Sequence, residues 1–129
     1  MRVIIVDDER LARRTMRLHL TAHPEIEVVG EAASVEQALS LIRAAKPDAV
    51  FLDIQMPGKS GFDLLAMLEQ PLNVIFVTAY AKHAIRAFEI NALDYLLKPI
   101  SQERLAVAVN RLLDGTLHDP KTDVESPLN

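Results

Sequence analysis

Ala49-Val50-Phe51-Leu52-Asp53 is a short apolar run that ends on a carboxylate. Runs that are apolar at every position are typical of strands covered on both faces, as in the parallel sheets of α/β proteins. The same pattern occurs at Val3-Ile4-Ile5-Val6 and at Val74-Ile75-Phe76-Val77, and weaker strands are predicted at 26–31 and 94–97. The chain is therefore expected to contain five strands.

Helical spacing of apolar residues fills the stretches between these strands. The expected helices cover 11–22, 35–45, a stretch after Ser60, 82–91, and a stretch after an N-cap at Ser101. Ser34, with Gln37 three residues later, has the pattern of a capping box. Strand and helix alternate five times, with connections too long for hairpins. This order predicts an α/β fold, a doubly wound five-stranded parallel sheet with helices on both faces.

Length, charge and cysteine content limit the class of protein. The 129 residues suit one compact domain, and the lack of cysteine excludes disulfides and thiol chemistry. No apolar run approaches the roughly 18 residues of a membrane span, and a secretory signal is missing, so we expect a cytoplasmic protein with no membrane partner. The net charge of −4 argues against a surface that itself binds nucleic acid.

Polar residues follow the predicted strands at one end. Asp7 and Asp8 follow the first strand, Asp53 the third, Thr78 closes the fourth, and Lys98 follows the fifth. The carboxyl ends of parallel strands meet at one edge of the sheet, where ligands bind in such folds. Three carboxylates gathered there repel one another unless a cation compensates. Mg²⁺ suits an open set of carboxylates, whereas the histidine and cysteine ligands typical of zinc are missing.

These residue types are the ones that phosphoryl transfer requires. The reaction needs an in-line nucleophile and groups that stabilise the phosphoryl oxygens. Asp53 can attack as a carboxylate, Thr78 can donate a hydroxyl hydrogen bond, and Lys98 can pair with a phosphoryl oxygen. Taken singly, each is more often a turn, strand-end or surface residue. Their placement at the ends of neighbouring strands favours the functional interpretation.

Four motifs carry a resemblance to a known family. They are Val6-Asp7-Asp8-Glu9, Leu52-Asp53-Ile54-Gln55-Met56-Pro57-Gly58, Thr78-Ala79-Tyr80 and Asp94-Tyr95-Leu96-Leu97-Lys98-Pro99. In this order and spacing they resemble the receiver (CheY-like) domains of two-component response regulators, over about residues 1–116. The resemblance implies a flavodoxin-like fold and a signalling domain that catalyses its own phosphorylation and dephosphorylation, rather than an enzyme acting on other substrates.

The resemblance also implies a role for each motif residue. Asp53 would be the phosphorylation site, and Asp7, Asp8, Asp53 and the backbone carbonyl of Gln55 would hold Mg²⁺. Thr78 and Lys98 would contact the phosphoryl group, with a cis peptide after Lys98. Tyr95 would be the switch aromatic that moves with Thr78, and Tyr80 would control access of water to the phosphoryl group.

The implied partners are a cognate sensor histidine kinase and a transcription output. Residues 78–99 resemble the receivers that precede a LytTR-type DNA-binding domain, so 117–129 are expected to be a linker toward a C-terminal domain absent from this chain. DNA would be bound only through that domain. Arg10, Arg13, Arg14 and Arg17 share one helix face, either a kinase-docking surface or a solvated charged face. Phosphorylation is expected to promote a homodimer through a mixed-charge face comprising Lys82, Arg86, Glu89, Asp94, Arg104 and Arg111.

Three alternatives remain open on the sequence. One is a stand-alone receiver, and another is a binding module that is never phosphorylated, although the complete acidic set argues against the latter. The third is a phosphatase of the haloacid-dehalogenase type. Those enzymes place the nucleophile after the first strand with a second aspartate two residues later, whereas Asp7 is followed at that distance by Glu9.

Overall fold

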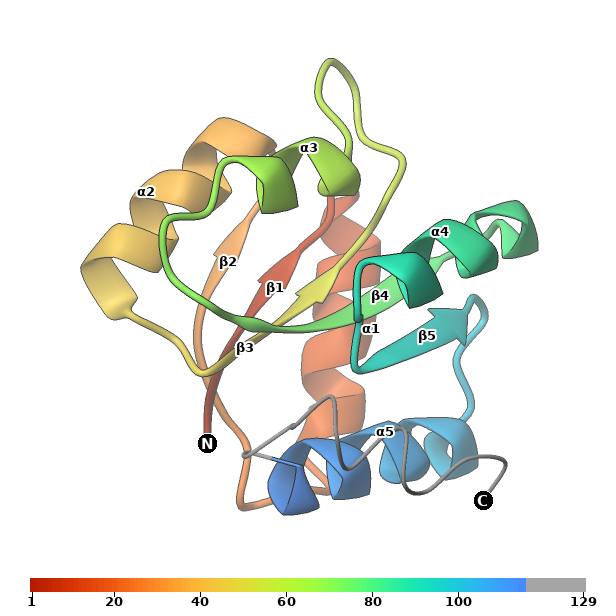
Figure 1. The fold of residues 1–129 in the computed structure, drawn as a ribbon. Coiled ribbons are helices and arrows are strands. Elements are labelled where there is room, and N and C mark those ends of the chain that lie inside the picture. Colours follow the sequence, from red (N-terminus) through yellow and green to blue (C-terminus); the bar gives the residue numbers. More distant parts are fainter. Residues whose placement is uncertain (116–129) are drawn as a thin grey trace.

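The computed structural model describes residues 1–115, and the predicted linker 117–129 lies outside them. The strands are β1 (Arg2–Val6), β2 (Glu27–Ala32), β3 (Ala49–Leu52), β4 (Asn73–Thr78) and β5 (Asp94–Leu97). The helices are α1 (Arg10–Leu20), α2 (Val35–Ala45), α3 (Gly61–Ala66), α4 (Ala84–Glu89) and α5 (Gln102–Asp114), with a 3₁₀ turn, η1 (Ala81–His83), before α4. The predicted order, in which strand and helix alternate five times, is confirmed (Figure 1).

All strand pairs are parallel, in the order β2-β1-β3-β4-β5. The chain leaves β1 toward one edge to form β2 and then crosses to the other side to form β3. The crevice beyond the carboxyl ends of β1 and β3 therefore lies where the winding direction reverses, which is where this fold places ligands. The register pairs Val6 with Leu52, so the residues that follow these two strands start side by side.

Helices cover both faces of the sheet, as predicted (Figure 1). Alternate residues of one strand point to opposite layers, so Val3 and Ile5 pack with α1 and α5, whereas Ile4 and Val6 pack with α2, α3 and α4. The strands β1, β3 and β4 contribute to both layers, which is why their sequences are apolar at consecutive positions.

N-cap serine side chains explain where α2, α3 and α5 begin. The Ser101 hydroxyl accepts from the Arg104 N–H, as predicted for an N-cap. Ser60 and Asp63 form a complete capping box at α3. The box predicted for α2 is only half formed. Ser34 accepts from the Gln37 N–H, but the Gln37 side chain accepts from Ala33, one residue before the cap.

The predicted helix over 82–91 is split. Residues 81–83 form the 3₁₀ turn, and the α-helix that follows covers only Ala84–Glu89. The Tyr80 carbonyl accepts a hydrogen bond from the Tyr95 hydroxyl. The Ala84 N–H bonds instead to the carbonyl of Ala81, which tightens the turn. The 3₁₀ turn and a hydrogen bond from β5 thus occur together just before α4.

Candidate functional site

Three carboxylates meet at the carboxyl ends of β1 and β3. Asp7, Asp8 and Asp53 each offer an oxygen, and these oxygens all lie within 4.8 Å of one another. Asp7 and Asp53 are buried, with 4% and 6% of their surface exposed, while Asp8 is half-buried. The Asp53 N–H donates to the Val6 carbonyl at 2.9 Å, which extends the β1–β3 pairing to the first residue after β3. The sequence prediction that these side chains converge is confirmed.

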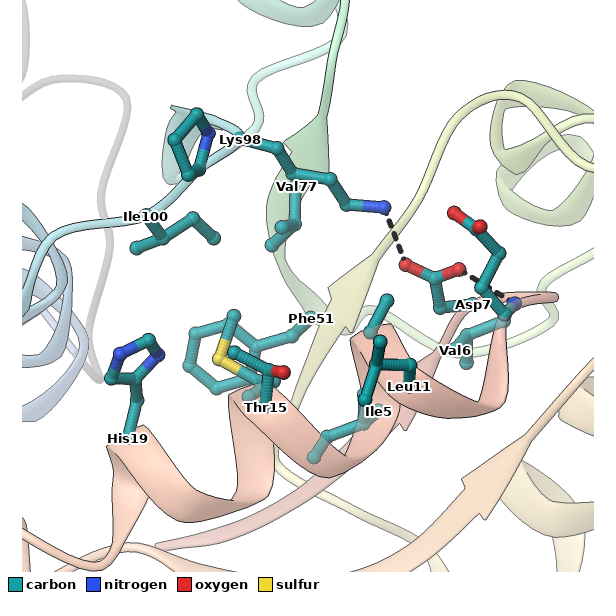
Figure 2. A pocket seen from close by; sticks show the side chains of 14 residues that line it. Ile5, Val6, Asp7, Leu11, Thr15, His19, Phe51, Val77, Lys98 and Ile100 are labelled. Atoms are coloured by element: carbon teal, nitrogen blue, oxygen red, sulfur yellow. Dashed lines mark hydrogen bonds and ion pairs between the residues drawn. The ribbon is translucent and has the colours of Figure 1, made fainter.

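Lys98 approaches the carboxylates from the end of β5. Its Nζ atom donates to Asp7 Oδ2 at 2.7 Å and to Asp53 Oδ2 at 3.3 Å. The peptide between Lys98 and Pro99 is cis, as the resemblance implied. Figure 2 shows the lysine stem extending along the pocket toward Asp7. One ammonium group therefore bridges the carboxylates of two different strands.

The surroundings of Asp53 shift the pKa of its carboxyl group. Burial raises the pKa of Asp53 to about 6, with the charge of Asp7 adding to the effect and Lys98 opposing it. For Lys98 itself, burial disfavours the charged form, but the hydrogen bond to Asp7 and the charges of both aspartates outweigh this cost and raise its pKa. The lysine therefore remains an ammonium and compensates only part of the acidic charge.

Donor chemistry at this edge fits a divalent cation that prefers oxygen. The three carboxylates supply oxygen ligands from two strand ends, and Asp8 leaves the site open to solvent. Such a partial cage matches Mg²⁺, which keeps several waters and uses few protein carboxylates. The Gln55 side chain is bonded to His83 Nε2 at 3.1 Å, which joins the loops after β3 and β4. The role expected of its backbone carbonyl stays a prediction.

Thr78, Tyr80 and Tyr95, the other predicted site residues, are connected to one another by hydrogen bonds at the ends of β4 and β5. Thr78 is fully buried, and its Oγ1 accepts from the Tyr80 N–H at 3.4 Å. Tyr80 is 46% exposed. Tyr95 is half-buried, packs 6.3 Å from Phe76 between ring centroids, and donates its hydroxyl to the Tyr80 carbonyl. Thr78 and Tyr95 are thus linked through the backbone of residue 80.

A cavity of about 310 Å³ adjoins the carboxylates. Its base is formed by Ile5, Phe51 and Val77 from the sheet, and α1 and residues 98–100 form its sides (Figure 2). Asp7 and Lys98 lie at its boundary with the acidic site. The cavity lies along the length of the Lys98 side chain.

One prediction about surface charge needs correction. Asp94, expected on an exposed face, is 7% exposed and bonded within the chain to Arg104 and Arg111. Burial makes this pairing necessary, because an unpaired carboxylate inside a protein is costly.

Two of the four arginines on the predicted face of α1 form ion pairs within the chain. Arg13 and Arg17 both pair with Glu31 of β2, while Arg10 and Arg14 are exposed. This cluster was not predicted from the sequence, because no local spacing links α1 to β2.

Within residues 1–115, no helix is long and apolar enough to cross a membrane.

Known proteins share both the sequence and the fold. Residues 3–110 match the response regulator receiver domain family. An uncharacterised response regulatory protein of Vibrio cholerae is 51% identical over 112 residues, which are 85% of this chain and 47% of that protein. The transcriptional regulatory protein BtsR of Salmonella typhi is 46% identical over 114 residues, 87% of this chain and 48% of that protein.

A further relative is the sensory transduction protein LytT of Bacillus cereus, 41% identical over 114 residues, 86% of this chain and 46% of that protein. The chain thus spans about half the length of these relatives. The response regulatory domain of mrkE from Klebsiella pneumoniae has the same fold, with a TM-score of 0.82, 33% identity, and coverage of 92% of this chain and 100% of that one. The chain therefore belongs to the response regulator receiver domain family, the signalling domains of two-component systems.

Proposed function

We propose that Asp53 accepts a phosphoryl group from the phosphohistidine of a cognate sensor histidine kinase. The observation that carries this proposal is the cluster of three carboxylates, two of which are bridged by a single lysine. A site used only for structure would gain stability from balanced charges, whereas this one holds more negative than positive groups. The imbalance suits a site that receives a cation and a phosphoryl group together.

The proposed step follows from the positions of the side chains. An Asp53 carboxylate oxygen attacks phosphorus in line, the phosphorus–nitrogen bond of the donor breaks, and its electron pair stays on the imidazole, which takes up a proton. The domain itself supplies the groups for this step and for later hydrolysis. Lys98, already 3.3 Å from Asp53, would pair with a phosphoryl oxygen.

Asp7, Asp8, Asp53 and the Gln55 carbonyl would hold Mg²⁺. When bound, the cation would supply positive charge that offsets the carboxylates and the incoming phosphoryl oxygens. Asp7 is buried and fixed by hydrogen bonds, whereas Asp8 is half-buried. The more open Asp8 is therefore proposed as the more direct ligand.

Thr78 and Tyr95 would transmit the signal. A new hydrogen bond from the Thr78 hydroxyl to the phosphoryl group would draw the end of β4 toward Asp53. Tyr95 would respond, because its hydroxyl is bonded to the residue 80 backbone that also contacts Thr78. Tyr80, 46% exposed, would limit access of water to the phosphoryl group. Inverting a 1:99 equilibrium requires about 5.5 kcal/mol, which a few charge-assisted hydrogen bonds can supply.

The output is proposed to be control of transcription from the cytoplasm. Two of the relatives are named as a transcriptional regulator and a sensory transduction protein, and both are about twice as long as the matched region. A DNA-binding domain in the parent protein would then follow this receiver. Apolar side chains are exposed on α4, β5 and α5, at Ile85, Phe88, Leu97 and Val107. They support a homodimer formed on phosphorylation, with Asp94 excluded as an intermolecular partner.

Intact mass spectrometry tests the central proposal. The chain is incubated with Mg²⁺ and acetyl phosphate, and the same is done with Asp53→Ala. One added phosphoryl group on the unmodified chain and none on the variant is the expected result. Addition of phosphate to the variant would move the site elsewhere, and no addition to either chain would favour a binding module that is never phosphorylated.

A further inference from the structure

Arg13 of α1 connects β2 to the loop that carries the acidic pair. Its Nη1 atom donates to the backbone carbonyl of Asp7 at 2.8 Å, and its Nε atom donates to Glu31 Oε1 at 3.1 Å. Only 16% of the Arg13 side chain is exposed, and its contact with the Asp7 carbonyl is partly buried, whereas the contact with Glu31 is exposed. The planar guanidinium presents these donors in a fixed geometry, which an ammonium does not.

This contact completes the fixation of Asp7. The Asp7 N–H donates to the Ala32 carbonyl of β2 at 3.1 Å. Its carboxylate accepts from the Glu9 N–H at 2.9 Å and from Lys98 at 2.7 Å. Arg13 occupies the one remaining polar group, the carbonyl. That carbonyl belongs to the peptide that leads into Asp8, so the arginine bears directly on the position of the neighbouring carboxylate.

The start of α1 offers little else to hold this loop. The Glu9 side chain makes no capping hydrogen bond, and the first turn contains no acidic residue. Glu31, in turn, is well suited to fix Arg13. Although burial opposes its ionisation, the hydrogen bonds from Arg17 and Arg13 lower its pKa, so it is charged at neutral pH.

We propose that Arg13 is a positioning residue that sets the affinity of the acidic site for divalent cations. This inference rests on the proposed Mg²⁺ site, and it gives Arg13 a role distinct from partner docking. Arg17 provides a matched control. It pairs with the same Glu31 carboxylate at 2.7 Å but, at 45% exposure, makes no hydrogen bond to the loop among the described contacts.

The test compares the unmodified chain with Arg13→Ala, Arg13→Lys and Arg17→Ala. Isothermal titration with Mg²⁺ is expected to show about tenfold weaker binding for Arg13→Ala, the scale at which groups that orient metal ligands act. Arg13→Lys should fall between, since one ammonium cannot span both contacts, and Arg17→Ala should leave the affinity unchanged. The phosphorylation rate of Arg13→Ala with acetyl phosphate should approach that of the unmodified chain at saturating Mg²⁺.

Hydrogen exchange without metal provides a second readout. The Glu9 amide, which donates to Asp7 Oδ1, is expected to exchange faster in Arg13→Ala but not in Arg17→Ala. Equal effects of the two alanine variants on affinity and exchange, or no effect of Arg13→Ala, would overturn the proposal. If Arg13→Ala fails to fold by circular dichroism, Arg13→Lys decides in the same way. Failure of the unmodified chain to bind Mg²⁺ would instead overturn the proposed function, and exchange would still test the loop contact.

Discussion

Asp53 and Asp94 are both buried carboxylates of the same sheet, yet their charge environments are opposite. Asp94, at the start of β5, accepts from Arg104 at 2.5 and 2.9 Å and lies 3.2 Å from Arg111. Asp53, just after β3, shares one lysine with Asp7 and lies beside Asp8. Asp94 thus has two cations to itself, whereas Asp53 belongs to a cluster of three carboxylates and shares its one lysine with Asp7.

The difference separates a structural site from a reactive one. The Asp94 contacts join α5 to β5 and satisfy both carboxylate oxygens within the chain. At Asp53, burial and the charge of Asp7 raise the pKa to about 6, so ionisation there costs free energy. A perturbed acid in an open cluster marks a functional site more reliably than a buried acid that is fully paired.

Replacing each acid by its amide should produce the largest contrast in phosphoryl uptake. Asp53→Asn removes the nucleophile and is expected to abolish phosphorylation by acetyl phosphate with Mg²⁺. Asp94→Asn leaves the acidic cluster intact and should still be phosphorylated. Intact mass after incubation distinguishes them, and a phosphorylated Asp53→Asn chain would break the comparison.

The same two variants should change stability in opposite directions. Asp94→Asn leaves two arginines without their carboxylate and is expected to cost about 2 kcal/mol, below the range for a fully buried pair because both arginines are partly exposed. Asp53→Asn removes a carboxylate that is strained by burial, and should gain about 2 kcal/mol at neutral pH without metal. Urea unfolding measures both, and changes of the same sign would contradict the contrast.

The Asp53 contribution should depend on pH with a defined sign. Its pKa of about 6 in the folded state lies above the ordinary value of 3.8, so the folded state binds this proton more tightly. Stability from this group is therefore full below pH 3.8 and is lost as the pH rises through about 6. The free energy of unfolding of the metal-free chain, minus that of Asp53→Asn, should fall across this window. A flat difference would refute the shifted pKa.

The smallest expected effects on stability come from removing the arginines that pair with Asp94. Arg104 makes two hydrogen bonds to the carboxylate, whereas Arg111 makes one ion pair and is 53% exposed. Arg104→Ala should cost about 1 kcal/mol and Arg111→Ala less than about 0.5 kcal/mol, in line with partly exposed ion pairs. Thermal unfolding with matched buffers resolves the order, and a reversed order would show that Arg111 carries the pairing.

The sequence predicts the parts of the molecule that depend on strand direction and on local patterns. Asp7, Asp53 and Lys98 converge because parallel strands place their carboxyl ends together, whatever the side-chain conformations. The Arg13–Glu31 and Arg104–Asp94 contacts depend on rotamers and packing, so the sequence shows these residues only as charges on separate helices and strands. The 3₁₀ turn at 81–83 was not predicted either, because helical spacing of apolar residues does not distinguish one 3₁₀ turn from the first turn of an α-helix.

The bond between the Tyr95 hydroxyl and the Tyr80 carbonyl has a practical consequence for spectroscopy. The chain contains two tyrosines and no tryptophan, and the two tyrosines are hydrogen-bonded to each other. Burial raises the pKa of the Tyr95 hydroxyl. Ultraviolet absorbance and fluorescence of the unlabelled chain therefore come mainly from one pair of rings, and breaking their hydrogen bond would change the signal without a background from elsewhere in the domain. Tyrosine absorbance and fluorescence can therefore report on this contact without an added label.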